Sequence, residues 1–176
     1  MEKTILLIGF CLLVLTGQVL ADAEKEHSMP GPVSVSPELE KIKALAGHWE
    51  GTTTTDGKTE PAAVEYSVTS GGSAVVEKLF PGTPHEMVSV YHDEAGKLMM
   101  THYCMLGNQP KLQLVGSQAS AFNFDLAPGN SFDPAKDQHM HSLQLAFEGE
   151  KGLTQSWTCY LKGQSDHTTL INLKRV

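Results

Sequence analysis

Histidine side chains are the groups in this chain with the most scope for chemistry. His139 and His141 stand two positions apart, a spacing that places both rings on one face of a β-strand. Imidazole nitrogens bind metal ions and haem iron, and neutral imidazole acts as a general base near neutral pH. The pair therefore indicates metal or haem ligation, catalysis, or a structural use in which polar rim residues hydrogen-bond to loop carbonyl groups. The sequence leaves these alternatives open.

A second group of polar side chains lies in residues 101–110, where a strand runs into a turn that contains glycine and proline. A histidine and a thiol are followed by two carboxamides that could bind the polar end of a ligand, although turn geometry alone also favours such residues. With one further histidine near the C-terminus, the two groups supply the candidate ligand-binding residues His102, Cys104, Asn108, Gln109, His139, His141 and His167. The candidate metal ligands among them are His139, His141 and His167.

Signatures of well-known enzyme classes are missing from the sequence. It contains no Gly-x-Ser-x-Gly nucleophile motif, no phosphate-binding loop and no His-Glu-x-x-His zinc motif. The net charge of -7 argues against a nucleic-acid partner, because phosphate binding requires clustered lysine and arginine. No basic amphipathic stretch favours an anionic membrane surface. Catalytic activity thus has no positive support, and the partner that we expect is a small-molecule ligand.

The N-terminal segment predicts export. A lysine precedes an apolar run, and Val19 and Ala21 satisfy the size rule for signal-peptidase cleavage. We therefore expect residues 1–21 to be a signal peptide, with cleavage after Ala23 as the alternative. Residues 22–36 are polar and contain proline, which is typical of a flexible linker. The mature protein would then be periplasmic or secreted, without a membrane anchor after cleavage.

Residues 37–176 predict a single all-β domain that begins with one short helix. Ser36-Pro37 is typical of a helix start, and apolar residues at helical spacing continue to Gly47, the expected stop. Beyond it, alternating runs are separated by turn signals about every 8–12 residues, which indicates antiparallel strands. Ten strands are expected, at residues 48–55, 62–69, 73–80, 86–92, 97–106, 111–116, 121–126, 139–148, 153–162 and 167–176. Their short connections favour a closed, ten-stranded antiparallel up-and-down barrel over a sandwich with a long crossing connection.

Strand direction predicts that the polar candidates meet at one end of this barrel. The proline-containing loops fall at one end and the compact turns at the other, so we expect an open mouth and a closed base. Alternation along the strands places His139, His141 and His167 on inward-facing positions near the mouth. The same alternation favours the inner face for His102 and Cys104. An apolar interior with polar groups at its mouth is the usual make-up of a ligand pocket.

Two stretches of the sequence resemble known families. Gly47-His48-Trp49, after a short helix, is similar to the Gly-x-Trp opening of the lipocalin and nitrobindin-like barrels. Residues 101–104 (Thr-His-Tyr-Cys) with 107–110 (Gly-Asn-Gln-Pro) resemble a block of exported, lipocalin-like bacterial proteins of unknown function. The resemblance implies a lipocalin-like barrel with an internal cavity and carries no established activity. Its nitrobindin-like side implies an alternative function, a haem protein with chemistry on nitrogen oxides, for which His167 is the nearest positional match to the haem ligand.

Two pairs of residues test this architecture. The first and last strands of a closed barrel pair, so Trp49 should lie beside Arg175 at the closed base, where a guanidinium can stack on an indole. Cys104 and Cys159 are the two cysteines left after cleavage, and their strands are four apart. In a round barrel they should lie on opposite walls, too far apart for a disulfide. We therefore expect two buried free thiols.

Overall fold

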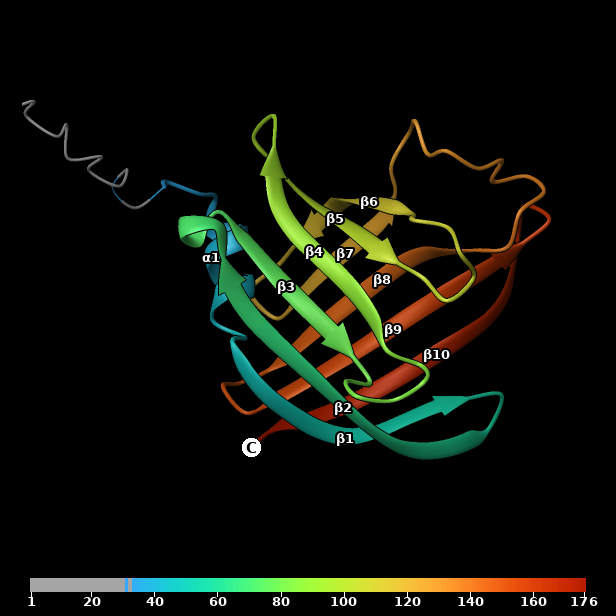
Figure 1. Cartoon of the computed structure of the whole chain (residues 1–176), viewed down its shortest axis with the longest axis horizontal. Helices are drawn as coiled ribbons and strands as arrows, with labels where there is room; N and C mark the ends of the chain where they lie inside the picture. The colour runs from blue at the N-terminus through green and yellow to red at the C-terminus, as the bar shows by residue number, and fades with distance from the viewer. Residues whose placement is uncertain (1–30, 32) are drawn as a thin grey trace, which may run out of the picture. The chain divides into compact units, whose positions relative to one another are not determined.

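Ten antiparallel strands close into one barrel because the first strand pairs with the last (Figure 1). In the computed structural model, which describes residues 31 and 33–176, every other pairing joins strands that are neighbours in the chain. The elements are α1 (Pro37–Lys43), β1 (Gly47–Thr55), β2 (Lys58–Thr69), the 3₁₀ turn η1 (Ser70–Gly72), β3 (Ala74–Leu79), β4 (Met87–Glu94), β5 (Lys97–Tyr103), β6 (Lys111–Ser117), β7 (Ala121–Leu126), β8 (His139–Glu148), β9 (Gly152–Leu161) and β10 (Gln164–Arg175). The predicted all-β, up-and-down barrel with one short helix is confirmed.

The predicted signal peptide and most of the predicted linker lie outside the described residues. Within the part of the chain that the structure describes, no helix is long and apolar enough to cross a bilayer.

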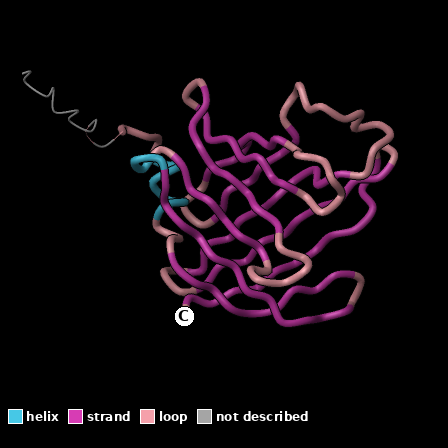
Figure 2. Tube along the Cα trace, viewed as in Figure 1, coloured by secondary structure: helices cyan, strands magenta, loops and turns pink. Residues whose placement is uncertain are grey.

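Helix α1 lies against one end of the barrel, which we call the closed end (Figure 2). Ser36 caps its N-terminus, since the backbone N–H of Leu39 donates to Ser36 Oγ at 3.0 Å. The Ser36 hydroxyl in turn donates to Asp93 on β4 at 2.7 Å, which fixes the helix to the barrel. The helix ends at Lys43, before the expected stop at Gly47. Gly47 is instead the first residue of β1 and has a positive φ of 130°.

The closed end is sealed by contacts between the first and last strands. Trp49 lies opposite Arg175 in the β1–β10 register, and the guanidinium carbon is 4.4 Å from the centre of the indole ring. The predicted pairing of these two residues is confirmed. The indole N–H of Trp49 donates to the backbone oxygen of Leu45 at 2.8 Å. At Gly51 a Cβ would lie 1.8 Å from the backbone oxygen of Asn172, so only glycine allows β1 and β10 to approach here.

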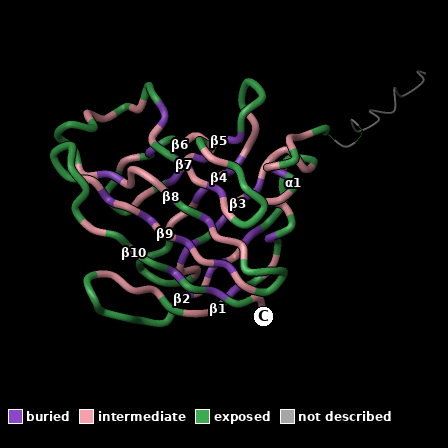
Figure 3. Tube along the Cα trace, turned by 180° about the vertical axis from the view of Figure 1, so that it is seen from behind, coloured by how far each residue is buried: buried purple, intermediate pink, exposed green. Residues whose placement is uncertain are grey.

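Side chains alternate between the interior and the outer surface along the strands, as the burial pattern in Figure 3 shows. On β9 the buried positions are the odd-numbered residues from Leu153 to Cys159, as the sequence predicts. Buried apolar side chains from α1 and from every strand form one core cluster. This core fills the barrel from the closed end upward.

Two β-bulges interrupt the alternation near the opposite end of the barrel. In the β8–β9 pairing the register shifts between Met140 and Ser142. In the β10–β9 pairing it shifts between Ser165 and His167. A bulge sets two residues of one strand against one of the other, and it changes the face on which the following side chains lie. These two shifts decide where the candidate histidines point.

Candidate functional site

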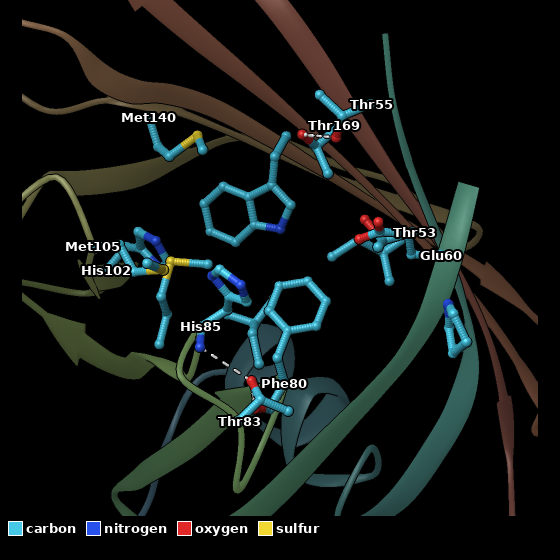
Figure 4. A pocket seen from close by; sticks show the side chains of 15 residues that line it. Thr53, Thr55, Glu60, Phe80, Thr83, His85, His102, Met105, Met140 and Thr169 are labelled. Carbon is cyan, nitrogen blue, oxygen red and sulfur yellow. Dashed lines mark hydrogen bonds between the residues drawn. The ribbon is translucent and has the colours of Figure 1, made fainter. Parts of the chain in front are cut away.

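A cavity of about 360 Å³ opens at the end of the barrel away from α1, which we call the open end. Figure 4 shows His102 and Met105 on one side of it, with Thr53 and Glu60 on the other. The predicted mouth and the cavity therefore coincide. Apolar side chains make up much of the wall, among them Phe80, Met87, Met105, Met140, Trp157 and Ile171.

His102 is a polar side chain buried in the wall of this cavity. Its Nδ1 atom lies 3.0 Å from Ser89 Oγ, and its ring centre lies 4.8 Å from that of the Trp157 ring. Its Nε2 atom is buried and has no hydrogen-bond partner among the described residues. Burial lowers the pKa of His102 from 6.5 to about 4, so the ring is neutral at neutral pH. An unpartnered buried polar atom costs about 1–3 kcal/mol, so a small side-chain shift that lets a bound molecule reach Nε2 would be favoured.

Below the cavity, toward the closed end, a buried carboxylate organises a hydrogen-bond network that the sequence analysis missed. Tyr66 and Gln155 donate to Glu77 Oε1, each at 2.6 Å, and Tyr91 donates to Oε2 at 3.0 Å. Gln155 also accepts a hydrogen bond from the indole N–H of Trp157, at 2.9 Å. Burial raises the pKa of Glu77, while its hydrogen-bond donors oppose the shift. The network therefore links the cavity wall to the core.

A sequence signal for this network was available. Glu77 occupies an inward position of β3, between the buried residues Val75 and Leu79. A charged residue in the inward phase of an apolar strand indicates a buried polar contact, because an isolated charge in the core would be too costly.

The predicted inward orientation of His139 and His141 is wrong. The β8 bulge sets Met140 opposite Cys159 on the inner face, and Met140 is the residue that lines the cavity. His139 pairs with the outward-facing Tyr160, and the His141 ring stacks on Tyr160 with ring centres 3.7 Å apart. Neither imidazole lines the cavity.

The two rings instead support the loop that precedes β8. His139 is buried against the ring of Phe132, and its Nδ1 atom lies 2.8 Å from the backbone oxygen of Asp137. Its Nε2 atom lies 3.0 Å from His141 Nδ1, and His141 Nε2 lies 3.4 Å from Asp125. Burial lowers the pKa of His141, and the charge of Asp125 opposes this. The contact of His139 with a loop carbonyl group matches the structural alternative, whereas His141 contacts side chains instead.

Asn108 and Gln109 lie in the β5–β6 loop and do not line the cavity either. Asn108 Nδ2 donates to the backbone oxygen of Gln138 at 2.7 Å, which ties this loop to the one before β8. Asn108 Oδ1 is buried without a partner among the described residues. Gln109 is exposed, and its side chain donates to the backbone oxygen of Gly107 in its own turn. Met105, which the sequence analysis did not select, lines the cavity from the same segment.

Cys104 and Cys159 are both free thiols, as predicted, but only Cys159 is fully buried. His167 lies opposite Cys159 on β10, with its Nδ1 atom 2.8 Å from Asp166 Oδ2. Neither Cys104 nor His167 lines the cavity. The position of His167 outside the cavity therefore offers no support for the alternative of haem ligation there.

Comparison with known proteins identifies a related fold and no related sequence. No protein-family model matches the chain, and no curated protein matches it in sequence. The chain is similar to the crystal structure of a protein with unknown function from the DUF3598 family of Nostoc punctiforme PCC 73102, with a TM-score of 0.52 at 12% identity. The match covers 84% of this chain and 51% of the other, so this chain spans about half the length of that protein. At this identity the likeness concerns the fold alone.

Proposed function

We propose that this barrel binds a small, largely apolar molecule in the cavity at its open end, with the polar end of the molecule hydrogen-bonded to His102 Nε2. The buried, unpartnered Nε2 atom in a mainly apolar wall is the observation that carries the proposal. The cavity of about 360 Å³ falls within the range of ligand pockets, roughly 300–1,000 Å³.

The charges around the cavity favour a neutral polar end on this molecule. His102 is uncharged at neutral pH, because burial lowers its pKa to about 4. Glu60 contributes a carboxylate to the cavity wall, and the chain carries a net charge of -7. A carboxylate ligand would therefore find no compensating positive charge from these groups. A hydroxyl group suits the site better, since it can donate to or accept from an imidazole nitrogen.

The open end offers a matched pair of variants for a binding test. Thr53 lines the cavity, whereas its neighbour Thr52 is exposed on the outer face of β1. Thr53→Trp should fill the cavity and weaken binding of the apolar fluorophore N-phenyl-1-naphthylamine by at least about tenfold, the effect of losing roughly 1.4 kcal/mol. Thr52→Trp should bind the fluorophore as the unmodified protein does. Equal binding of the fluorophore by the two variants would show that it does not bind in the cavity.

The polar contact is tested by competition between decanol and decane for the same fluorophore. Decanol should displace it more effectively than decane from the unmodified protein, because only the alcohol can bond to His102 Nε2. In His102→Phe this preference should disappear while both compounds still compete. Native mass spectrometry of gently purified protein adds a direct search for a bound mass. A preference for decanol that survives in His102→Phe would exclude His102 as the polar contact.

We also infer that the protein acts in a periplasm or outside the cell. The basis is the N-terminal sequence, with its apolar run and a cleavage pattern ending at Ala21. N-terminal sequencing of protein recovered from the extracytoplasmic fraction should begin at Asp22, or at Glu24 if cleavage follows Ala23. Recovery of the intact chain from the cytoplasm alone would contradict export.

A further inference from the structure

The bulge in β10 gathers three potential metal ligands at the open end of the barrel. Register pairs Ser165 with Tyr160 and His167 with Cys159, so Asp166 is the extra residue of the bulge. Bulges are common at the rims of barrels, where they change the direction of a side chain. Here the thiol of Cys159, a carboxylate oxygen of Asp166 and an imidazole nitrogen of His167 all lie within 4.8 Å of one another.

These three groups form a chemically consistent donor set. Thiolate, imidazole and carboxylate are the ligands that Zn²⁺ uses in proteins, with bonds of about 2.0–2.3 Å. Tetrahedral ligand atoms at those bond lengths stand roughly 3.3–3.6 Å apart. Side-chain rotations of about 1 Å would therefore complete the site, by closing the wider separations within the 4.8 Å group and slightly opening the 2.8 Å contact between Asp166 and His167. The short contact between Asp166 and His167 already fixes the orientation of the imidazole ring.

The surroundings suit a metal that keeps one coordination position free. Cys159 is buried, while the side chains of His167 and Asp166 are 24% and 39% exposed, so an ion can enter from solvent. The side-chain nitrogen of Gln138 lies 3.6 Å from the sulfur of Cys159 and orients the thiol. Three protein ligands with an open fourth position are typical of zinc sites that bind water or a further ligand.

We propose that Cys159, Asp166 and His167 bind a divalent transition-metal ion, with Zn²⁺ as the best match to the donor set. Binding replaces the thiol proton of Cys159, which passes to solvent, by a metal–sulfur bond. None of the three residues lines the apolar cavity, so this site is separate from the proposed ligand pocket. The two proposals can therefore fail independently.

The His141–Asp125 pair on the outer face provides an internal control. Like His167 with Asp166, it places an imidazole nitrogen near a carboxylate, at 3.4 Å. Among the described residues, His141 and Asp125 have no third metal-binding group close enough to complete a site. The hydrogen bonds and ion pairs of His141 involve no thiol. If a histidine and a carboxylate were enough to bind the metal, His141→Ala would reduce metal binding. Metal binding at the proposed site should be unaffected by this substitution.

Cobalt titration of the reduced, chelator-free protein tests the proposal, because Co²⁺ takes up zinc sites and reports a thiolate ligand through a near-ultraviolet charge-transfer band. We expect one equivalent of Co²⁺ to produce this band and Zn²⁺ to abolish it. Cys159→Ser should eliminate the band. Asp166→Asn and His167→Ala should each weaken binding by about 10–100-fold, the effect of losing a ligand or the residue that orients one. Cys104→Ser and His141→Ala should leave the band in place.

Two results would overturn the proposal. One is the absence of a charge-transfer band at millimolar Co²⁺ from protein whose circular dichroism shows it to be folded. The other is a band that persists in Cys159→Ser and is lost in Cys104→Ser, which would assign the metal to the other thiol. Thermal unfolding of each variant without metal separates loss of a ligand from loss of the fold.

Discussion

The two ends of the barrel differ in how completely some of their polar atoms are hydrogen-bonded. At the closed end, the Arg175 guanidinium donates to the backbone oxygens of Ala44, Ala46 and Glu150 while it stacks on Trp49. At the open end, His102 Nε2 and Asn108 Oδ1 are buried without partners among the described residues.

We therefore infer that the closed end mainly stabilises the fold, whereas the open end carries the proposed ligand site. Where hydrogen bonds are complete, substitution should lower stability and leave binding intact in the molecules that remain folded. Where a buried group lacks a partner, substitution should change binding and cost little stability. The four predictions below test this division, from the largest expected effect to the smallest.

Trp49→Ala should have the largest effect, because it removes the largest fully buried side chain among the described residues. Trp49 is 1% exposed, and truncation of a buried aromatic residue costs about 3–5 kcal/mol. Urea unfolding measures the loss. Thr52→Ala, on the exposed face of the same strand, is the control and should change stability by less than about 0.5 kcal/mol. A loss below about 1 kcal/mol for Trp49→Ala would mean that the closed end does not stabilise the barrel.

Acidification should destabilise the open end through His102. The imidazole takes up a proton at pH 6.5 in the unfolded chain but only near pH 4 in the folded one, because burial disfavours the charged ring. The stabilisation is thus complete above pH 6.5 and is lost as the pH falls toward 4. Relative to His102→Gln, the free energy of unfolding should fall by about 3 kcal/mol across this window.

The comparison with His102→Gln cancels the titration of all other groups, Glu77 included. His85→Gln serves as the control, because His85 is an exposed imidazole at the rim of the same cavity. Parallel pH profiles for the unmodified protein and His102→Gln would show that His102 is not buried in a neutral state.

Glu77→Gln tests whether the buried network between the two ends contributes to stability, since Glu77 lies below the cavity and inside the core. Three donors point at the Glu77 carboxylate, and a carboxamide would turn an N–H group toward some of them. We expect a loss of about 1–3 kcal/mol, the cost of leaving buried donors unsatisfied. Chemical denaturation at neutral pH measures it, and a gain in stability would show that the buried charge is a net burden on the fold.

Arg175→Lys should have the smallest effect of the four. The ammonium group keeps the positive charge near Trp49 but cannot reproduce the hydrogen bonds to Ala44, Ala46 and Glu150 together. The expected loss is about 0.5–2 kcal/mol in thermal or chemical unfolding. Fluorophore binding at the open end should stay unchanged, and a marked change there would break the division between the two ends.

The sequence alone was sufficient to predict the architecture and the closed end. Turn residues and period-two alternation placed all ten strands, and the pairing of first and last strands put Trp49 beside Arg175. These features follow from local alternation and turn residues, which can be read directly from the sequence, and from the pairing of the first and last strands in a closed barrel. Ser36 as the helix cap was predictable for the same reason.

The open end was predicted only in part, because bulges have no strong sequence signature. The alternation that correctly placed Leu143 on the inner face also pointed to His139 and His141, but the bulge at Met140 reversed their phase. His102 lies on the inner face as predicted. Glu77 was not predicted because its hydrogen-bond partners come from three other strands and form no cluster with it in the sequence.

The close approach of β1 and β10 at Gly51 affects how the chain folds. Gly51 pairs with Leu173 and lies against the backbone oxygen of Asn172, and both residues belong to the last strand. The edge of β1 therefore stays uncovered until nearly the whole barrel has been made. Contacts between such distant segments form slowly, and an uncovered strand edge can pair with another chain in the meantime. The threonine run from Thr52 to Thr55 keeps that waiting edge polar. A substitution at Gly51 that delays closure should therefore appear as aggregation during refolding, and the recovered monomers should bind the fluorophore as the unmodified protein does.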